Sequence, residues 1–380
     1  MSDISIKPIV MPKWGLSMSE GKLTGWLKQP GEKVAVGDEL LEVETDKITN
    51  VVEAGDAGIL RRAIGEPQTV YPVKALLGVL ADEDVSDAEI DAFVASYVTP
   101  AADEEEEGEE AGPSYEFVDL GGGIGTVRYA KRGDGARTIL LIHGFGGDLD
   151  NWLFNVDALA ASDATVYALD LPGHGQSVKI LADPTVAGLS KAVASFMDAV
   201  GIDAAHLIGH SMGGAVAMRT ALDHPPRVKS LALIAAAGLG PEINRDYLAG
   251  FVASSSRREL KPFVEMLFAN KDLVSRQLVE DLLKYKRIDG VGDALRALSS
   301  SLVEEGEQET LLASARDGLK VPVLVVWGAE DRIVPAAHAA ALGEGAKVEL
   351  IEGAGHMVQM EQANRVNAAL KEHIAAAATG

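Results

Sequence analysis

Short apolar segments separated by turn residues fill the first eighty residues, and they occur twice in the same order. The first half contains Gly25, Trp26, Leu27, Val34, Leu40 and Leu41, and the second contains Gly58, Ile59, Leu60, Val70, Leu76 and Leu77. Short strands with frequent turns are typical of small all-β domains. The repeat therefore predicts a β-sandwich with two similar halves over residues 1–80.

A strand pair in the middle of this repeat is expected to place a lysine at the tip of a turn. Residues 41–44 and 49–53 have strand character, and Asp46 and Lys47 lie between them. A single lysine on a turn is usually only a surface charge. The central position in the repeat argues against so simple a role for Lys47.

From about residue 114 the pattern changes to longer apolar runs that alternate with alanine-rich helical segments. The compact apolar runs are residues 138–142, 165–169, 206–208, 230–235 and 321–326. Such runs are typical of strands buried on both faces of a parallel sheet. We therefore expect a multidomain protein, with an α/β domain that has a mostly parallel sheet after the N-terminal sandwich.

A G-x-S-x-G motif follows one of these strands directly. The motif is Gly209-His210-Ser211-Met212-Gly213, and a helical stretch over residues 215–222 comes next. In this strand-turn-helix context the glycines permit a tight turn that exposes the serine hydroxyl above the sheet. Ser211 is therefore the predicted nucleophile.

A serine nucleophile needs a base and an acid, which should follow it in the order Ser, acid, His. Asp331 comes after the strand 321–326, and His356 lies in a glycine-containing loop after the strand 348–351. We assign His356 as general base and acid and Asp331 as its partner, with Glu330 as the alternative acid. We expect structural roles for other histidines, with His338 and His373 on helix surfaces and His224 at a helix end.

The oxyanion formed on attack needs backbone donors at the same end of the sheet. One is expected to be the amide of Met212, directly after the nucleophile, and the other the amide of Phe145, in the loop that follows the strand 138–142. His143 and His210 flank glycines in these two loops, where we expect them to hold the backbone by hydrogen bonds. The turn 170–177 is expected to be structural.

Composition and charge narrow the classes of function. The 380 residues include no cysteine, which excludes disulfides, thiolate metal sites and a cysteine nucleophile. A net charge of −23 argues against partners such as nucleic acid or an anionic membrane. No apolar run reaches the length of about 18 residues that a membrane span needs, and no signal peptide is evident. We therefore expect a soluble cytoplasmic protein.

Much of the negative charge lies in one segment. Residues 81–110 contain 13 acidic and no basic side chains, whereas residues 111–380 carry a net charge of only −8. Within the acidic segment, residues 86–98 have apolar positions at helical spacing, and Ser86 precedes them as an N-cap. The like-charged run that follows is expected to remain an extended linker.

The N-terminal residues resemble a lipoyl domain of 2-oxo-acid-dehydrogenase-type complexes. The resemblance rests on Gly37-Asp38 and Leu40 running into Glu44-Thr45-Asp46-Lys47, and it covers residues 3–80. It implies covalent attachment of lipoate to Lys47. Biotinyl domains share the fold but usually have methionine on each side of the lysine, so Asp46 and Ile48 favour lipoate.

The later motifs together resemble the α/β-hydrolase superfamily over roughly residues 115–378. Residues 241–317 break the strand–helix alternation and look like the helical cap of that fold. The predicted organisation is therefore a lipoyl domain over residues 1–80, an acidic helix and linker over 81–113, and a catalytic domain over 114–380.

The pairing of these two domains resembles the acetyltransferase components of bacterial acetoin dehydrogenase complexes. This resemblance implies transfer of an acetyl group from S-acetyl-dihydrolipoyl-lysine to coenzyme A through an acyl-serine. It also implies two partners, a thiamine-diphosphate-dependent dehydrogenase component and a dihydrolipoyl dehydrogenase. The His-x-x-x-Asp-Gly signature and the small subunit-binding domain of ordinary lipoyl acyltransferases are absent from the sequence.

Two other functions are compatible with the residues. The triad does not distinguish water from coenzyme A as acceptor, so a serine esterase or thioesterase with a carrier domain is one alternative. A lipoyl carrier with a non-catalytic scaffold domain is the other. Arg257, Arg258 and Lys261 in the cap are candidates for contact with the phosphates of coenzyme A, although an ordinary solvated helix face also explains them. No metal site is expected.

Overall fold

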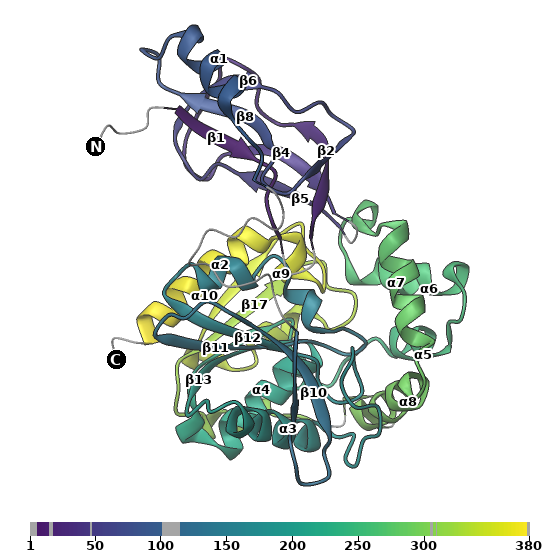
Figure 1. Ribbon diagram of the computed structural model, residues 1–380. Helices are drawn as coiled ribbons and strands as arrows, with labels where there is room; N and C mark the ends of the chain where they lie inside the picture. Colours follow the sequence, from purple (N-terminus) through teal and green to yellow (C-terminus); the bar gives the residue numbers. More distant parts are fainter. Residues whose placement is uncertain are drawn as a thin grey trace. The chain divides into compact units, whose positions relative to one another are not determined.

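The computed structural model describes residues 6–14, 18–45, 48–100, 115–304, 307–308 and 310–377. The chain separates into two compact units, Met1–Gly112 and Pro113–Gly380, and each is treated by itself (Figure 1). The finer boundaries expected at residues 80, 113, 241 and 317 remain predictions.

Two four-stranded sheets form the N-terminal unit. Their strand orders are β1-β8-β6-β3 and β5-β4-β2-β7, and all strand pairs are antiparallel. Each sheet thus takes strands from both halves of the sequence repeat. The elements are β1 (Ile6–Val10), β2 (Glu20–Trp26), β3 (Lys33–Val34), β4 (Glu39–Glu44), β5 (Thr49–Glu53), β6 (Gly58–Ala63), β7 (Thr69–Pro72), β8 (Leu76–Ala81) and α1 (Asp87–Ser96).

The alternating apolar side chains of these strands form one core between the sheets. Leu23, Leu41 and Leu60 are fully buried in it. Helix α1 begins with a complete capping box, in which Ser86 accepts from the Glu89 amide and the Glu89 carboxylate accepts from the Ser86 amide. Its Ile90 packs beside Val79 of β8, so the predicted helix belongs to the same folded unit.

An eight-stranded sheet in the order β18-β17-β14-β13-β11-β12-β10-β9 forms the centre of the second unit. Strands β11, β12, β13, β14, β17 and β18 pair with one another in parallel, and β10 and β9 pair antiparallel at one edge. The strands are β9 (Glu116–Asp119), β10 (Thr126–Arg132), β11 (Arg137–Ile142), β12 (Ala164–Leu169), β13 (Ala205–His210), β14 (Val228–Ile234), β17 (Val323–Gly328) and β18 (Ala346–Ile351).

Helices cover both faces of this sheet. Figure 1 shows α3 and α4 on one side and α2, α9 and α10 on the other. The helices are α2 (Val156–Ala160), α3 (Val186–Ala199), α4 (Met212–Asp223), α9 (Val358–Glu361) and α10 (Ala363–Ala377). Because both faces are covered, every residue of β13 and β17 is buried. The predicted fold class, an all-β sandwich followed by an α/β domain with a mostly parallel sheet, is confirmed.

Four helices and a short strand pair form an insertion between β14 and β17. They are α5 (Arg245–Ala253), α6 (Arg257–Val264), α7 (Arg276–Lys286), α8 (Val291–Leu302), β15 (Val303–Glu304) and β16 (Glu307–Gln308). The Gln308 side chain accepts from the Gly238 amide at 2.7 Å and donates to the carbonyls of Gly240 and Glu242 at 2.7 and 3.0 Å. The two ends of this cap are therefore fastened to each other.

Two of the structural expectations for histidines were wrong. His338 and His373 are each only 7% exposed, not on helix surfaces. His338 forms a hydrogen bond with Glu242, at the start of the cap, with Nε2 and Oε2 2.7 Å apart. His373 lies on the buried face of α10. His224 terminates α4, as predicted.

Candidate active site

The turn between β13 and α4 holds Ser211 in a strained backbone conformation. Its φ and ψ are 55° and −122°, values that cost free energy for a residue with a side chain. The Ser211 amide donates to the Ile234 carbonyl at 2.9 Å, which fixes the turn against the neighbouring strand. A Cβ on Gly213 would lie 2.2 Å from the Ile142 carbonyl oxygen, and one on Gly209 would lie 2.2 Å from the Gly213 carbonyl oxygen. The glycines of the motif are therefore required for this close approach.

Asp331 and His356 form a buried pair at the carboxyl ends of β17 and β18. The distance between His356 Nδ1 and Asp331 Oδ2 is 2.8 Å, and the two side chains are 3% and 0% exposed. Trp327 Nε1 donates to the same oxygen at 3.0 Å, while the amides of Ile333 and Val334 donate to Oδ1 at 2.8 and 3.0 Å. Since an ionised carboxylate only accepts, His356 carries its proton on Nδ1 and leaves Nε2 free to act as a base.

Glu330, the alternative acid, has a different set of partners. Its two carboxylate oxygens accept from the amides of Gly353 and Ala354 at 3.2 and 3.0 Å. It therefore holds the loop that carries His356, while Asp331 contacts the imidazole itself. Of the two candidate acids, the structure brings Asp331 to His356.

His210 connects the nucleophile turn to the His356 loop. Its Nε2 donates to the His356 carbonyl at 2.9 Å, and the two imidazole rings are 4.8 Å apart. Burial lowers the pKa of His210 well below its usual range, so the ring is neutral. On the opposite side, a Cβ on Gly144 would lie 2.9 Å from Ser211 Cβ and 3.0 Å from His210 Nδ1. Three loops that are far apart in the sequence therefore meet around Ser211.

The amides of Phe145 and Met212 are available as oxyanion donors. Within the described residues neither donates to a protein acceptor, whereas the neighbouring amide of Gly146 donates to His174 Nε2 at 3.1 Å. Met212 is the first residue of α4, where a backbone N–H has no acceptor within the helix. The roles of these two amides as oxyanion donors stay a prediction.

A buried histidine holds the loop that contains Phe145. His143 Nε2 accepts from the Leu171 amide at 3.0 Å, and its Nδ1 donates to the Gly144 carbonyl at 2.8 Å. Burial lowers the pKa of His143, so the neutral ring keeps one donor and one acceptor. This is the supporting role expected for His143. Asp170, in the turn that was expected to be structural, forms a buried ion pair with Arg128 at 2.6 Å.

The cap contacts the loop that contains Phe145 through aromatic rings. The rings of Phe145 and Phe251 on α5 have centroids 6.0 Å apart, and a Cβ on Gly146 would meet the Phe251 ring at 2.6 Å. Lys286 on α7 donates to the carbonyl oxygens at the end of α5, including that of Ser254, and its ammonium lies 5.1 Å from the Phe251 ring centroid. The cap is thus packed onto the loop that contains Phe145 by a close contact of the Phe251 ring.

Lys47 and Asp46 lie outside the described residues. The residues on either side of them close the base of the hairpin β4–β5. The Thr45 amide donates to the Ile48 carbonyl at 3.0 Å, and the Ile48 amide donates to Thr45 Oγ1 at 3.0 Å. The position of Lys47 itself stays a prediction.

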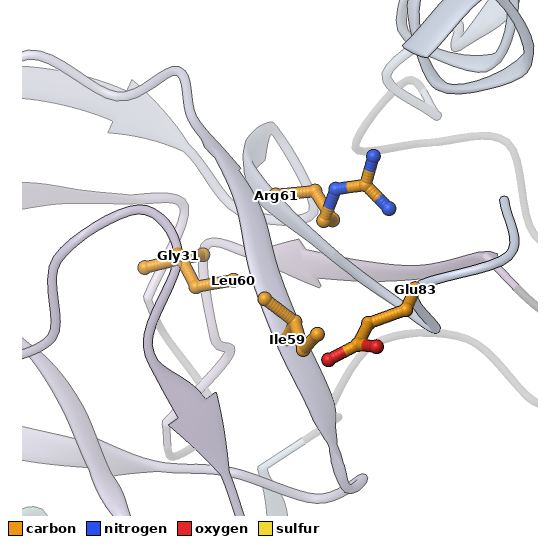
Figure 2. A pocket seen from close by; sticks show the side chains of 5 residues that line it. All are labelled: Gly31, Ile59, Leu60, Arg61 and Glu83. Atoms are coloured by element: carbon orange, nitrogen blue, oxygen red, sulfur yellow. The ribbon is translucent and has the colours of Figure 1, made fainter. Parts of the chain in front are cut away.

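The N-terminal unit also has a shallow hollow, shown in Figure 2 and lined by Gly31, Ile59, Leu60, Arg61 and Glu83. Arg61 already donates to the carbonyls of Asp82 and Val85, and it pairs with Asp87 at 3.0 Å. The hollow therefore offers no uncommitted arginine to a ligand.

Neither a metal cluster nor a membrane helix is found in the described part of the chain. Its histidines and carboxylates form no group that could hold a metal ion. Its helices are too short or too polar to cross a membrane.

Comparisons with known proteins define the class first. The family model for the alpha/beta hydrolase fold matches residues 137–363, and the model described as "Biotin-requiring enzyme", for biotin/lipoyl domains, matches residues 7–70. A meta-cleavage product hydrolase from Pseudomonas fluorescens IP01 is similar in structure, with a TM-score of 0.63 at 24% identity over 69% of this chain and 98% of its own. This last likeness shows the fold alone. The chain is thus an α/β-hydrolase-fold protein with a biotinyl/lipoyl-type domain.

Two curated relatives match nearly the whole chain. Both are described as the dihydrolipoyllysine-residue acetyltransferase component of an acetoin cleaving system. The protein from Cupriavidus necator is 56% identical over 97% of this chain and 98% of its own length. The protein from Pseudomonas putida is 47% identical over 95% and 96%. The chain belongs to this family of acetyltransferase components, which confirms the family that the sequence resembled.

Proposed function

We propose that this protein transfers an acetyl group from a dihydrolipoyl thioester on Lys47 to coenzyme A through an acetyl ester of Ser211. The observation that carries the proposal is the buried Asp331–His356 pair at the carboxyl ends of β17 and β18, together with the strained Ser211 turn after β13. The activity named for the two relatives supports the same reaction. The proposal includes two partners, a thiamine-diphosphate-dependent dehydrogenase component and a dihydrolipoyl dehydrogenase. It also includes a location in the cytoplasm.

The hairpin β4–β5 fits a covalently attached carrier. Because Thr45 and Ile48 bond to each other at its base, only Asp46 and Lys47 remain between them. Lipoate attached to Lys47 would form a long arm that moves between sites. Bound lipoate would supply a thiol that carries the acetyl group as a thioester and leaves readily, while the protein supplies orientation.

His356 acts first as a general base. Its Nδ1–H is held by Asp331, so Nε2 takes the proton from Ser211 Oγ. Ser211 Oγ then bonds to the thioester carbonyl carbon, and the amides of Phe145 and Met212 stabilise the oxyanion. His356 returns the proton to the leaving sulfur as the carbon–sulfur bond breaks. The product of this half-reaction is acetyl-Ser211 and a free thiol.

The second half-reaction uses the same groups in reverse. His356 takes the proton from the thiol of coenzyme A, and the sulfur attacks the ester carbonyl of acetyl-Ser211. The oxyanion again rests on Phe145 and Met212. His356 then protonates Ser211 Oγ as the ester bond breaks, which releases acetyl-CoA. Thiols have pKa values near about 8.5, so their deprotonation asks little of the imidazole.

Two variants separate the carrier from the catalyst. With acetoin, the dehydrogenase component and coenzyme A, both Lys47→Arg and Ser211→Ala should abolish acetyl-CoA formation. With free S-acetyl-dihydrolipoamide as donor, Lys47→Arg should retain transfer and Ser211→Ala should not. Retained transfer by Ser211→Ala with either donor overturns the proposed chemistry.

The products distinguish the remaining alternatives. Acetate formed at the same rate with and without coenzyme A would indicate a hydrolase. Failure of Ser211 to react with a fluorophosphonate would indicate a carrier with an inert scaffold. Acetyl-CoA formation with an intact mass gain of one acetyl group on Ser211, before coenzyme A is added, is the result that supports acyl transfer.

A further inference from the structure

The loop that carries His356 is held by carboxylates along its backbone. Three consecutive amides, those of Gly353, Ala354 and Gly355, donate to acidic side chains. The first two donate to Glu330, and Gly355 donates to Glu361 Oε2 at 2.6 Å. The orientation of the imidazole therefore depends on two carboxylates that do not contact it.

Glu361 also binds the cap. While Oε2 accepts from Gly355, Oε1 accepts from the amides of Ala269 and Asn270 at 2.9 and 3.2 Å. These two residues connect α6 and its short 3₁₀ extension to the next turn of the cap. One partly buried carboxylate thus joins a cap segment to the loop of His356.

Direct packing reinforces this connection. The Met357 amide, directly after His356, donates to the carbonyl of Leu267 in the cap at 3.0 Å. A Cβ on Gly355 would lie 2.7 Å from the Ala269 nitrogen. No room for adjustment exists between the two backbones, so a displacement of the cap segment 267–270 moves the His356 loop with it.

The cost of keeping a carboxylate at this position argues for a specific role. Burial raises the pKa of Glu361, and the charge of the nearby Glu330 raises it further, while the three amide donors oppose both effects. An apolar side chain would satisfy the packing without this cost, but it would leave three backbone amides without an acceptor.

We propose that Glu361 is a positioning residue that couples the placement of the cap to the orientation of His356 during acyl transfer. The inference rests on the proposed function, because it assumes that His356 exchanges protons with Ser211. It adds that the cap acts on the base through Glu361, in addition to its contact through Phe251 with the loop that contains Phe145.

The test compares three variants. Glu361→Gln keeps the size of the side chain but replaces one of its two oxygens by an NH₂ group. In either orientation this donor faces a backbone N–H, so at least one of the three amides loses its acceptor. Ala269→Pro removes a cap donor and substitutes no residue of the His356 loop. Phe268, which precedes it, is already extended with φ −115° and ψ 141°, as a residue before proline requires. Glu330→Gln perturbs the same loop without a bond to the cap.

The rate of acetyl transfer is normalised to the Ser211 that a fluorophosphonate titrates, so that loss of folded protein does not count as loss of catalysis. Glu361→Gln should lower kcat by roughly 10- to 100-fold and change KM by less than about threefold, since small misplacements of catalytic groups have effects of this size. Ala269→Pro should lower kcat in the same direction. The double variant should lose no more than Glu361→Gln alone, because both changes break one connection.

Three results would overturn the inference. They are a normal kcat for Glu361→Gln, strictly additive effects of Glu361→Gln and Ala269→Pro, or non-additivity of the same size between Glu330→Gln and Ala269→Pro. The Ser211→Ala variant separates these failures from failure of the proposed function. If it is inactive while Glu361→Gln is normal, only the coupling is refuted; if it is active, the acyl-serine chemistry is refuted.

Discussion

Substitution of Asp331 by asparagine changes one atom in a carboxylate that is surrounded by donors. All four hydrogen-bond partners of Asp331 donate to it, two to each oxygen. The asparagine amide nitrogen must therefore face donors in either orientation. The two orientations differ in what each one leaves without a partner.

If the nitrogen faces the amides of Ile333 and Val334, two backbone N–H groups lose their acceptor, at a cost of about 1–3 kcal/mol each. If it faces His356, Trp327 Nε1 still has the Val334 carbonyl at 3.1 Å. The imidazole can then accept the asparagine N–H by moving its own proton from Nδ1 to Nε2. The second orientation costs fewer hydrogen bonds, so we expect it to prevail.

A His356 ring that is protonated on Nε2 cannot take the proton of Ser211. In a serine enzyme the wrong tautomer lowers kcat by about 10⁴-fold, which corresponds to about 5.5 kcal/mol of transition-state stabilisation. We therefore expect Asp331→Asn to retain its fold and to lose acetyl transfer by about this factor. Stopped-flow acylation of Ser211 measures the rate, and ¹⁵N chemical shifts of the histidine ring report the tautomer.

Glu330→Gln is the matched control, because it alters the adjacent carboxylate without touching the imidazole. It should reduce acylation far less than Asp331→Asn. A kcat within about tenfold of wild type for Asp331→Asn, or equal losses in the two variants, would show that Asp331 does not set the tautomer.

Three further predictions concern stability. Gly213→Ala should lower the urea midpoint, because its Cβ would lie 2.2 Å from the Ile142 carbonyl oxygen, and overpacking costs about 1–3 kcal/mol or more; an unchanged midpoint would contradict the geometry. Arg128→Met should lower the free energy of unfolding by about 3–5 kcal/mol because it leaves the buried Asp170 charge unpaired, and the same loss in Arg128→Met/Asp170→Leu would refute that cause. Burial lowers the pKa of His206 from 6.5 to about 4, so the unfolded chain binds more protons than the folded chain between these pH values. The free energy of unfolding therefore falls as pH falls through this range, by at most about 3 kcal/mol for this group. In urea titrations at different pH values, His206→Asn should flatten this part of the stability curve, and an unaltered slope would exclude His206 as its source.

The main features of the catalytic domain could be predicted because they depend on local sequence. Strands β13 and β17, which support Ser211 and Asp331, are buried on both faces, so each is a mostly apolar run that is easy to recognise. Strand β18, which precedes His356, is more exposed, and its apolar residues alternate with Lys347 and Glu349. Ser211, Asp331 and His356 follow the ends of these strands within five residues. By contrast, β9 (Glu116–Asp119) lies at the sheet edge with mostly exposed side chains, and its two apolar residues are too few to mark a strand.

Residues whose roles depend on distant partners could not be predicted. His338 is expected on a helix surface from the sequence, but it is buried against Glu242, which is 96 positions earlier in the chain. Glu361 lies only five residues after His356, yet its bond to Ala269 spans 92 positions. No periodicity or motif in one sequence encodes such a contact, since it arises only when the cap folds back onto the sheet.

The fastening of the cap by Gln308 has a consequence for how proteins of this architecture can be altered. The chain leaves the sheet near Gly238 and returns beside it at Gln308 and Leu312. The two ends of the insertion therefore lie next to each other. Any other insertion joined to the sheet at the two anchor points, Gly238 and Gln308, needs ends that lie equally close together. A segment grafted in place of the cap must therefore meet these two anchor points and also reproduce the contacts of residues 267–270 with the His356 loop.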